Sequence, residues 1–202
     1  VHQVMEAKKL RYPIPYMEHV KRTGEELAKN LSNVGIDWWP TSEYVPLPIY
    51  LPSILEEVSP EYDFYVTITR GIQSGWGMNV DNPWLIELGQ HDLNQQGIVM
   101  NKGAAEARGI REGDEIWVEI PEGYRVKGTV KLMEGIHPKC MGIICGTGNW
   151  ARAAGVGLRK GVNFNDLLML NARHISAVVQ NIETAALVKV YKAEKVAEEK
   201  EE

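Results

Sequence analysis

The chain has few cysteines: only Cys140 and Cys145 occur in 202 residues. They lie five positions apart on a predicted strand, so they should point to opposite faces and not pair with each other. Zinc and iron–sulfur sites usually take four ligands in short repeats, which two cysteines cannot supply. We therefore expect two small buried hydrophobic residues, with neither a metal ligand nor a catalytic residue assigned to this chain.

Long hydrophobic runs and an excess of positive charge are also absent. No stretch of about 18 apolar residues occurs, so no direct membrane span is expected. The formal net charge is −5, and residues 193–202, with five Glu and two Lys, contribute −3 of it. The remaining chain is nearly neutral, whereas general nucleic-acid binding needs a basic face. Nucleic acid is not an expected partner.

The N-terminal part combines a helical pattern with many prolines. Residues 17–31 (MEHVKRTGEELAKNL) carry apolar residues at helical spacing, weakened by Gly24. Five prolines between Pro40 and Pro60 then disfavour helix and interior strand. We predict that residues 1–61 form a helix and an extended segment, rich in Pro and Trp, that wraps over this domain or a partner. The first residue is Val and no signal-peptide pattern follows, so the N-terminus is interpreted as processed, truncated or internal, and the compartment stays open.

From residue 62 onward the pattern is mostly β. Six short apolar runs predict strands: Asp63–Thr69, Gly97–Asn101, Glu115–Ile120, Tyr124–Met133, Cys140–Cys145 and Ala186–Lys192. One short helix is predicted between them, at Lys102–Gly109. Six strands with one or two small helices indicate a mainly β fold with short helices (α+β), a compact barrel over residues 62–192. The charged tail at 193–202 is predicted to be disordered.

Two polar loops follow predicted strands, Thr69–Trp84 and Gly146–Leu168. Both are rich in Gly, Asn, Ser and Gln, with Arg and Trp between them. Glycines let a backbone approach a ligand and present N–H groups, amides pair with heterocycle edges, and Arg neutralises phosphate. Six cations are expected around these loops: Lys102, Arg108, Arg111, Arg152, Arg159 and Lys160. A large, flat, anionic ligand such as a nucleotide-bearing cofactor fits this pattern.

The six tryptophans divide into two predicted groups. Trp76 and Trp150 are flanked by glycine and polar residues, so we expect them next to the ligand, where a flat ring can stack. The other four are interpreted as packing residues: Trp38, Trp39, Trp84 and Trp117.

Four sequence blocks, in this order, form a recognisable pattern: TRGIQSGWGMNVDNPWLIEL, MNKGAAEARGIREGDEIWVE, IHPKCMGIICGTGNWARAAGVGLRKGVNFNDLLML and ALVKVYKA. Together they resemble the C-terminal dinucleotide-binding domain of the molybdopterin oxidoreductases, the dimethyl sulfoxide reductase family. The loops are most similar to the polysulfide, thiosulfate and arsenate reductase branch. The resemblance implies a six-stranded double-psi β-barrel. It also implies a pair of pterin guanine dinucleotides (bis-MGD) that carry molybdenum or tungsten.

The resemblance further implies a set of cofactor contacts. In the first loop, the residues implied to line a pterin or phosphate contact are Arg70, Gln73, Ser74, Gly75, Trp76, Met78 and Asn79. Asn101 is implied near a dinucleotide, and five residues around pterin edges: Gly148, Asn149, Trp150, Asn163 and Asn165. Gln180 and Asn181 would meet the cofactor from the closing segment. The chain departs from the family at Gln73-Ser74 and Gly148-Asn149, and the second loop lacks an obvious acidic partner for guanine.

In the family, the protein ligand to the metal and the iron–sulfur cysteine motif lie upstream of this domain. The resemblance therefore implies the C-terminal, cofactor-binding part of a catalytic subunit of an oxidoreductase. Its implied partners are the remainder of that subunit and an iron–sulfur electron-transfer subunit, with any iron–sulfur cluster outside this chain. Two alternatives stay open: the same domain in a non-redox hydratase or hydroxyl transferase, or a non-catalytic carrier or assembly subunit.

Overall fold

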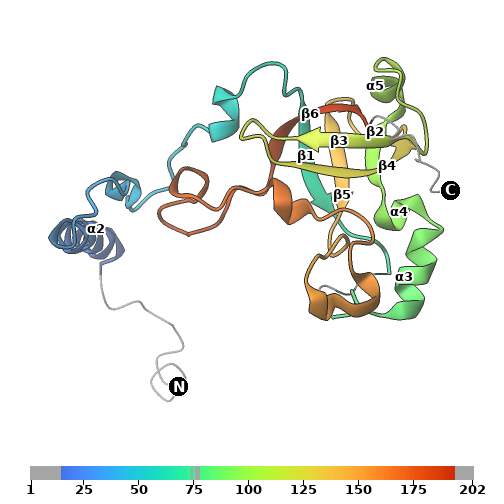
Figure 1. Cartoon of the computed structure of the whole chain (residues 1–202). Coiled ribbons are helices and arrows are strands. Elements are labelled where there is room, and N and C mark those ends of the chain that lie inside the picture. The colour runs from blue at the N-terminus through green and yellow to red at the C-terminus, as the bar shows by residue number, and fades with distance from the viewer. Residues whose placement is uncertain (1–14, 74, 76–77, 194–202) are drawn as a thin grey trace, which may run out of the picture. The chain divides into compact units, whose positions relative to one another are not determined.

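The structure, a computed structural model, describes residues 15–73, 75 and 78–193 (Figure 1). By their internal contacts the residues divide into two units. Of the described residues, those of 15–53 and 170–182 form the first, here the helical unit; those of 54–169 and 183–193 form the second, the barrel unit. The division predicted from sequence, with boundaries after residues 61 and 192, stays a prediction. The part of the predicted tail from residue 194 on lies outside the described residues.

The helical unit is organised by helix α2, Tyr16–Asn33, which extends slightly beyond the predicted range. Gly24 is its one buried residue, and Tyr44 covers it. A Cβ at position 24 would lie only 3.1 Å from Tyr44 Cβ. The glycine that lowers helix propensity thus allows the Tyr44 ring to pack against the helix. The Tyr44 hydroxyl donates to the carbonyl of Ala177 at 2.8 Å, so residues 170–182 are bound to the same unit.

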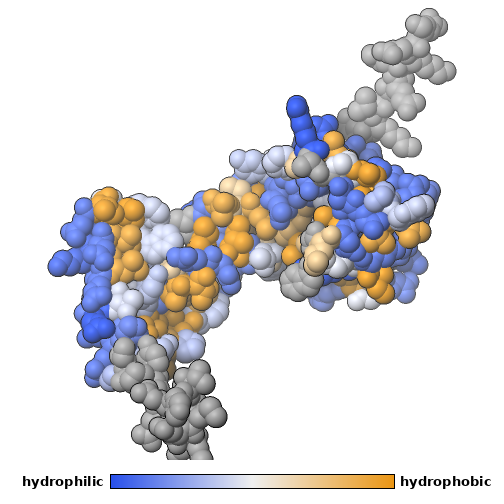
Figure 2. All heavy atoms as spheres, turned by 90° about the horizontal axis from the view of Figure 1, so that it is seen from below, coloured by the Kyte–Doolittle hydropathy of each residue, from blue (hydrophilic) through white to orange (hydrophobic). Residues whose placement is uncertain are grey.

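Short 3₁₀ turns complete the helical unit: η1 at Thr41–Glu43 and η5 at Ala172–His174. The proline-rich stretch carries no strand, as its sequence predicts. Trp38 is exposed and lies edge-on to the Trp39 ring, so the packing role predicted for it stays a prediction. A groove of about 570 Å³ lies between α2 and residues 41–46, and Figure 2 shows apolar surface exposed in this part of the molecule.

Six strands close the barrel, one at each range predicted from sequence: β1 Phe64–Thr69, β2 Ile98–Asn101, β3 Glu115–Glu119, β4 Arg125–Met133, β5 Cys140–Ile144 and β6 Ala186–Lys192. Their order is β1-β5-β2-β4-β3-β6, and β6 pairs with β1. The pairs β1·β5 and β2·β4 are parallel, and the other four are antiparallel. The predicted six-stranded barrel is confirmed.

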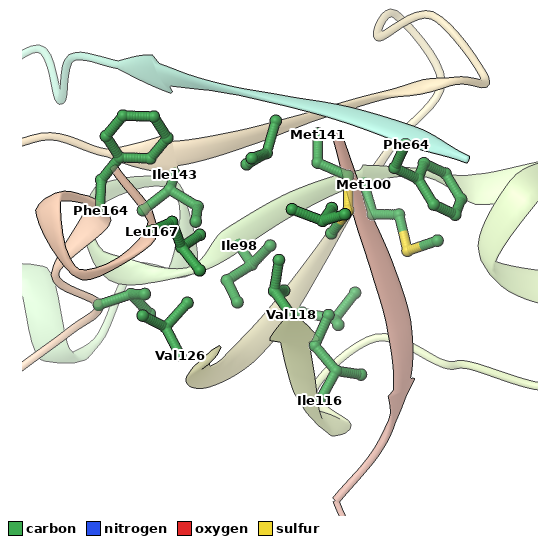
Figure 3. Packing of buried hydrophobic residues seen from close by; sticks show 14 of the residues in the cluster. Phe64, Ile98, Met100, Ile116, Val118, Val126, Met141, Ile143, Phe164 and Leu167 are labelled. Atoms are coloured by element: carbon green, nitrogen blue, oxygen red, sulfur yellow. The ribbon is translucent and has the colours of Figure 1, made fainter. Parts of the chain in front are cut away.

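The barrel interior is filled by alternate strand residues and by the end of the second polar loop. Both phenylalanines of the chain are buried there: Phe64 on β1, and Phe164 in the 3₁₀ turn η4, Phe164–Leu167. Figure 3 shows Phe164 and Leu167 on one side of the apolar cluster and Phe64 on the other. The loop that carries the polar residues is therefore anchored in the core by its own apolar side chains.

Two helices of the barrel unit were not predicted: α3, Pro83–Gln90, and α4, Leu93–Gln96. Asn82 caps α3, since its Oδ1 accepts from the amides of Trp84 at 3.0 Å and Leu85 at 3.3 Å. Pro83 occupies the first turn, where its missing N–H costs nothing. The packing role predicted for Trp84 is wrong, because its side chain on α3 is 79% exposed. The predicted helix α5 is confirmed but shorter, at Lys102–Glu106.

An ion pair on the outer face of the barrel predicts a pH-dependent stability. Glu119 Oε1 lies 2.9 Å from Lys189 Nζ, and the Tyr191 hydroxyl donates to Glu119 Oε2 at 2.7 Å. Lys189, and then Tyr191, hold the pKa of Glu119 below its usual value. A depressed carboxyl pKa stabilises the folded state above the unfolded pKa, and this contribution is lost as pH falls through the folded value.

Glu119→Gln should therefore lower the melting temperature of the barrel at pH 7 by about 2 °C, with the difference from wild type shrinking below about pH 4. Thermal unfolding at pH 7 and pH 3.5 measures both. The exposed Glu106, changed to Gln, is the matched control. An equal effect of Glu119→Gln at both pH values would contradict this assignment.

Candidate functional site

The two polar loops leave the barrel from neighbouring strands at the same end. β1 and β5 run parallel with Thr69 opposite Ile144, so both strands end at one level. The amide of Cys145 donates to the carbonyl of Thr69 at 2.7 Å, which joins the loop roots directly. Figure 1 shows α3 and the orange second-loop segment at this end of the barrel, and α5 at the other. The parallel pairing therefore brings together two segments some seventy residues apart in sequence.

The second loop is closed at its base by Thr147. Thr147 Oγ1 lies 3.1 Å from the carbonyls of Ile144 and Val162, and it accepts the amide of Val162 at 3.2 Å. The amide of Gly148 donates to the carbonyl of Lys160 at 2.5 Å. Between these contacts the backbone turns repeatedly, with positive φ at Gly146, Gly148, Gly155, Arg159 and Gly161. Positive φ angles allow these tight reversals, which bring the chain back to the base of the loop.

Asp166 organises the predicted pterin-edge residues of the second loop. Its Oδ1 accepts from the Trp150 indole N–H at 3.3 Å and from Asn163 Nδ2 at 2.9 Å. Asn163 Oδ1 in turn accepts the amide of Asn165 at 3.3 Å. The Asn163 side chain is thus engaged at both ends within the loop, while the Trp150 side chain is 65% exposed. Sequence reasoning found no acidic residue of interest here and missed Asp166.

Asn149 and Asn165 keep part of their hydrogen-bonding capacity. Asn149 Oδ1 accepts the amide of Ala151 at 2.9 Å, and its backbone carbonyl accepts the amide of Arg159 at 2.6 Å. Within the described part of the chain, the Nδ2 group of Asn149 and the side chain of Asn165 have no hydrogen-bond partner. These two exposed amides can pair with an added ligand without breaking a contact.

Asn79 has a structural role in the first loop. Its Oδ1 accepts the amide of Gly75 at 2.8 Å, and its Nδ2 donates to the carbonyl of Gln73 at 2.8 Å. The side chain therefore closes the turn in which these predicted contacts lie. Met78 is almost fully exposed beside it. The predicted contacts Ser74 and Trp76 fall outside the described residues.

Arg70 lines a hollow of about 360 Å³ that extends from the roots of the two loops to the segment after β4. The hollow is lined by Thr69 and Arg70 from the first root, Ile144 from the second, and Asn94, Val99, Met133, Gly135 and Ile136. Arg70 is thus the one cationic residue among the described residues that line this hollow.

Asn101 lies away from the loops. It ends β2, which runs antiparallel to β5, so it lies at the opposite end of the barrel. Its Oδ1 accepts the amide of Ala104 at 3.1 Å and caps α5, while its Nδ2 donates to the carbonyl of Ile136 at 2.8 Å. Both ends of this amide are engaged within the chain.

Gln180 and Asn181 belong to the helical unit. Gln180 adopts a positive φ of 57° in a turn where its amide donates to the carbonyl of Ser176 at 2.9 Å. The amide of Ser176 donates to the carbonyl of Asn181 at the same distance.

Taken together, the structure brings Arg70, Gln73, Met78 and Asn79 to one end of the barrel with the five second-loop residues. It does not bring Asn101 there.

The cations expected around the loops fall into two groups, those that lie in the second loop and those that lie near α5. Lys102 pairs with Glu134 at 3.3 Å and Arg108 pairs with Asp63, which precedes β1, so these two were wrongly expected near the loops. Arg152, Arg159 and Lys160 do lie in the second loop. Across the described residues, none of these three is paired with a carboxylate. The three second-loop cations are therefore available to an anionic ligand, whereas Lys102 and Arg108 are paired with carboxylates. Arg111, the sixth expected cation, follows α5 and lies outside both loops.

Two negative findings concern metals and membranes. In the described ranges no group of three or more His, Cys, Asp or Glu side chains could hold a metal ion. No helix among the described residues has the length and apolar character needed to cross a membrane. Cys140 and Cys145 are free and half-buried, not fully buried as expected.

Comparisons with known proteins agree with this geometry. The family model described as "Molydopterin dinucleotide binding domain" matches residues 65–186, which include β2 to β5, all of β1 but its first residue, both polar loops and the first residue of β6. No curated protein matches the sequence. Among solved structures, acetylene hydratase from Pelobacter acetylenicus has a similar fold, with a TM-score of 0.50 and 19% identity. The match covers 81% of this chain but 22% of that one, so the chain spans about a fifth of that protein's length.

Proposed function

The chain belongs to the molydopterin dinucleotide binding domain family, and from this premise we propose that it is the C-terminal, cofactor-binding part of a molybdenum or tungsten oxidoreductase. In this proposal it holds pterin guanine dinucleotides (bis-MGD) for a reaction at a metal carried with the rest of the enzyme. The observation that supports this most strongly is the common origin of the two polar loops on the parallel strands β1 and β5.

The donors of the loop end suit the periphery of such a cofactor. Arg152, Arg159 and Lys160 would neutralise its phosphates, and the amides of Asn149 and Asn165 would pair with its polar edges. The exposed Trp150 ring, held by Asp166, offers a flat face for stacking. When bound, the cofactor supplies the metal and its redox chemistry. The residues of this chain bind it, orient it and match its polar groups.

Hydrogen bonds from the protein to the cofactor would act on the metal indirectly. Donors around a ligand change its basicity and orientation, and so the properties of the metal that it holds. Unmatched polar groups of a buried pterin would each cost about 1–3 kcal/mol, so a complete set of loop donors is needed. The proposed role is therefore positioning, with no catalytic residue on this chain.

The proposed partners are the remainder of the catalytic subunit and an iron–sulfur electron-transfer subunit. Two observations support the first. The chain spans only 22% of acetylene hydratase, and the helical unit exposes large apolar side chains, among them Trp38, Leu47 and Tyr50. Apolar surface of this extent usually marks an interface. The electron-transfer partner rests on the family resemblance alone.

A non-redox hydration reaction is the second candidate, because the similar solved structure is a hydratase. At 19% identity this likeness concerns the fold alone, and both reactions would use the same cofactor. Turnover of the purified enzyme with and without an added electron acceptor separates the two reactions. Oxidoreduction requires the acceptor, whose reduction is followed by its absorbance, and hydration proceeds without one. A stand-alone carrier would bind the cofactor and show neither activity.

Removing second-loop cations tests the proposal. The double variant Arg152→Ala/Arg159→Ala, in the complete enzyme, should release pterin about tenfold faster or more, since each charge-assisted contact is strong. Pterin fluorescence of the released material during dialysis measures the rate. The matched control Lys102→Ala/Lys139→Ala removes the same charge elsewhere on the barrel unit and should release pterin at the wild-type rate. Equal release from both double variants would refute the assignment.

A further inference from the structure

Val80 and Asp81 of the first loop fit against glycines of the second. A Cβ at Gly146 would lie 2.8 Å from Val80 Cγ1, and one at Gly155 would lie 3.1 Å from Asp81 Oδ2. Gly157 is buried, and its amide donates to Asp81 Oδ1 at 3.3 Å. The two loops thus meet at three positions that carry no side chain. Larger residues there would hold the loops apart.

The Asp81 carboxylate meets the second loop where its chain reverses. After Gly155 the amide of Leu158 donates to the carbonyl of Gly155 at 3.3 Å, and that of Lys160 to the carbonyl of Gly157 at 3.2 Å. The chain then returns through Lys160 to the base of the loop. Among the described residues no Lys or Arg pairs with Asp81. The carboxylate instead accepts a hydrogen bond from a backbone amide of the turn, that of Gly157.

We propose that Asp81 is a positioning residue, a latch that joins the two polar loops so that ordering one of them orders the other. The latch consists of the Asp81 carboxylate with Gly155 and Gly157. Its contribution to cofactor binding rests on the proposed function, but the latch itself is a property of the loops without ligand. Because coupling between two sites is reciprocal, a ligand held by the second loop would also order the first loop and α3.

Amide hydrogen exchange in the ligand-free protein tests the latch. Asp81→Ala removes the acceptor, so the Gly157 amide should exchange about tenfold to a hundredfold faster, with a smaller acceleration at Lys160. Asp81→Asn keeps an acceptor oxygen and should stay within about threefold of wild type. Glu106→Ala is the matched control: it removes an exposed carboxylate on α5, outside both loops, and should leave Gly157 unchanged. Unaltered exchange at Gly157 in Asp81→Ala would overturn the proposal.

A double-mutant cycle separates the contact from backbone strain. Gly155 has a φ of 55°, so Gly155→Ala is strained in any background. In the wild type the new methyl group would also press on the Asp81 carboxylate, and this second effect should disappear in Asp81→Ala. We expect the acceleration of Lys160 exchange caused by Gly155→Ala to be about threefold smaller in the Asp81→Ala background. Equal accelerations in both backgrounds would show that the two residues are uncoupled and would contradict the latch.

The effect on the cofactor needs a separate readout. In the complete enzyme, Asp81→Ala should release pterin about tenfold faster, and Asp81→Asn should restore slow release. If the wild-type enzyme holds no pterin, the proposed function fails while the exchange results still decide on the latch. If pterin is held and both variants release it at the wild-type rate, the latch is overturned as a determinant of cofactor binding and the proposed function survives.

Discussion

Phe164→Ala should destabilise the barrel unit by about 3–5 kcal/mol, although Phe164 belongs to a loop rich in polar residues. Phe164 is 4% exposed and packs in the core cluster with Leu167 and Val162. Val162 fits over Gly128 of β4, where a Cβ would overlap the Val162 side chain. Losing the Phe164 ring therefore opens a cavity and loosens the anchor of the second loop. Denaturant unfolding followed by tryptophan fluorescence measures the loss of stability.

Phe64 provides the matched control for this experiment. It is the only other phenylalanine, it is 1% exposed, and it lies on β1 in the same cluster. Phe64→Leu and Phe164→Leu should each cost about 1–1.5 kcal/mol, mild enough for both variants to fold. Only Phe164→Leu should accelerate hydrogen exchange at the amides of Gly148 and Lys160. Equal acceleration in the two variants would show that the second loop is not anchored through Phe164.

Gly148→Ala should have the second large effect, about 2–4 kcal/mol, and should open the base of the second loop. Gly148 has a φ of 68°, and a Cβ there would overlap the backbone nitrogen of Asn163. The overlapping atoms belong to the main chain, so no side-chain rotation relieves the clash. The hydrogen bond from the Gly148 amide to the Lys160 carbonyl should be lost, and with it the position of Lys160 and Arg159.

Gly109→Ala isolates the contribution of the clash. Gly109 has a φ of 67°, nearly the same as that of Gly148, but nothing lies within 4 Å of a Cβ placed there. The backbone strain alone should cost about 1–2 kcal/mol in this variant. The difference in unfolding free energy between the two alanine variants then measures the steric closure of the loop base. If the two substitutions cost the same, the loop base is not tightly closed.

The strands could be predicted from sequence because each is a short apolar run bounded by turn residues. The ranges for β3, β4 and β6, for example, agree with the predicted ones to within one residue. The closed arrangement and the pairing of β1 with β5 could not be derived from composition or periodicity. Strand pairing depends on contacts between distant segments, and only the family resemblance carried that information.

Helix α3 shows a different limit. Its capping signal, Asn82 followed by Pro83, is visible in the sequence, but the first two residues of the helix were interpreted as the end of the polar loop and no helix was predicted after them. Trp84 was expected to pack because it is large and apolar. It lies on the outer face of α3, where Leu88 one turn later is also exposed. Burial of one helix side depends on the surface that the helix covers, and residue type alone does not determine it.

The candidate site was predictable as two loops but not residue by residue. Asn79, Asn101 and Asn163 have the side-chain amide expected of a cofactor contact, yet each bonds to the chain at both ends of that amide. Asparagine is favoured in turns and caps for the same reason that it binds ligands, so sequence cannot separate the two uses. Asp81 was missed because its partner lies 76 positions away.

The identity of the ligand tests the central claim most directly. The complete enzyme, purified with its partners, is denatured, and the released small molecules are analysed by mass spectrometry together with the metal content. The account predicts a pterin dinucleotide, with guanine as the base, in a ratio of two per molybdenum or tungsten atom, as the family resemblance implies. Release of NAD or flavin with no pterin would contradict it.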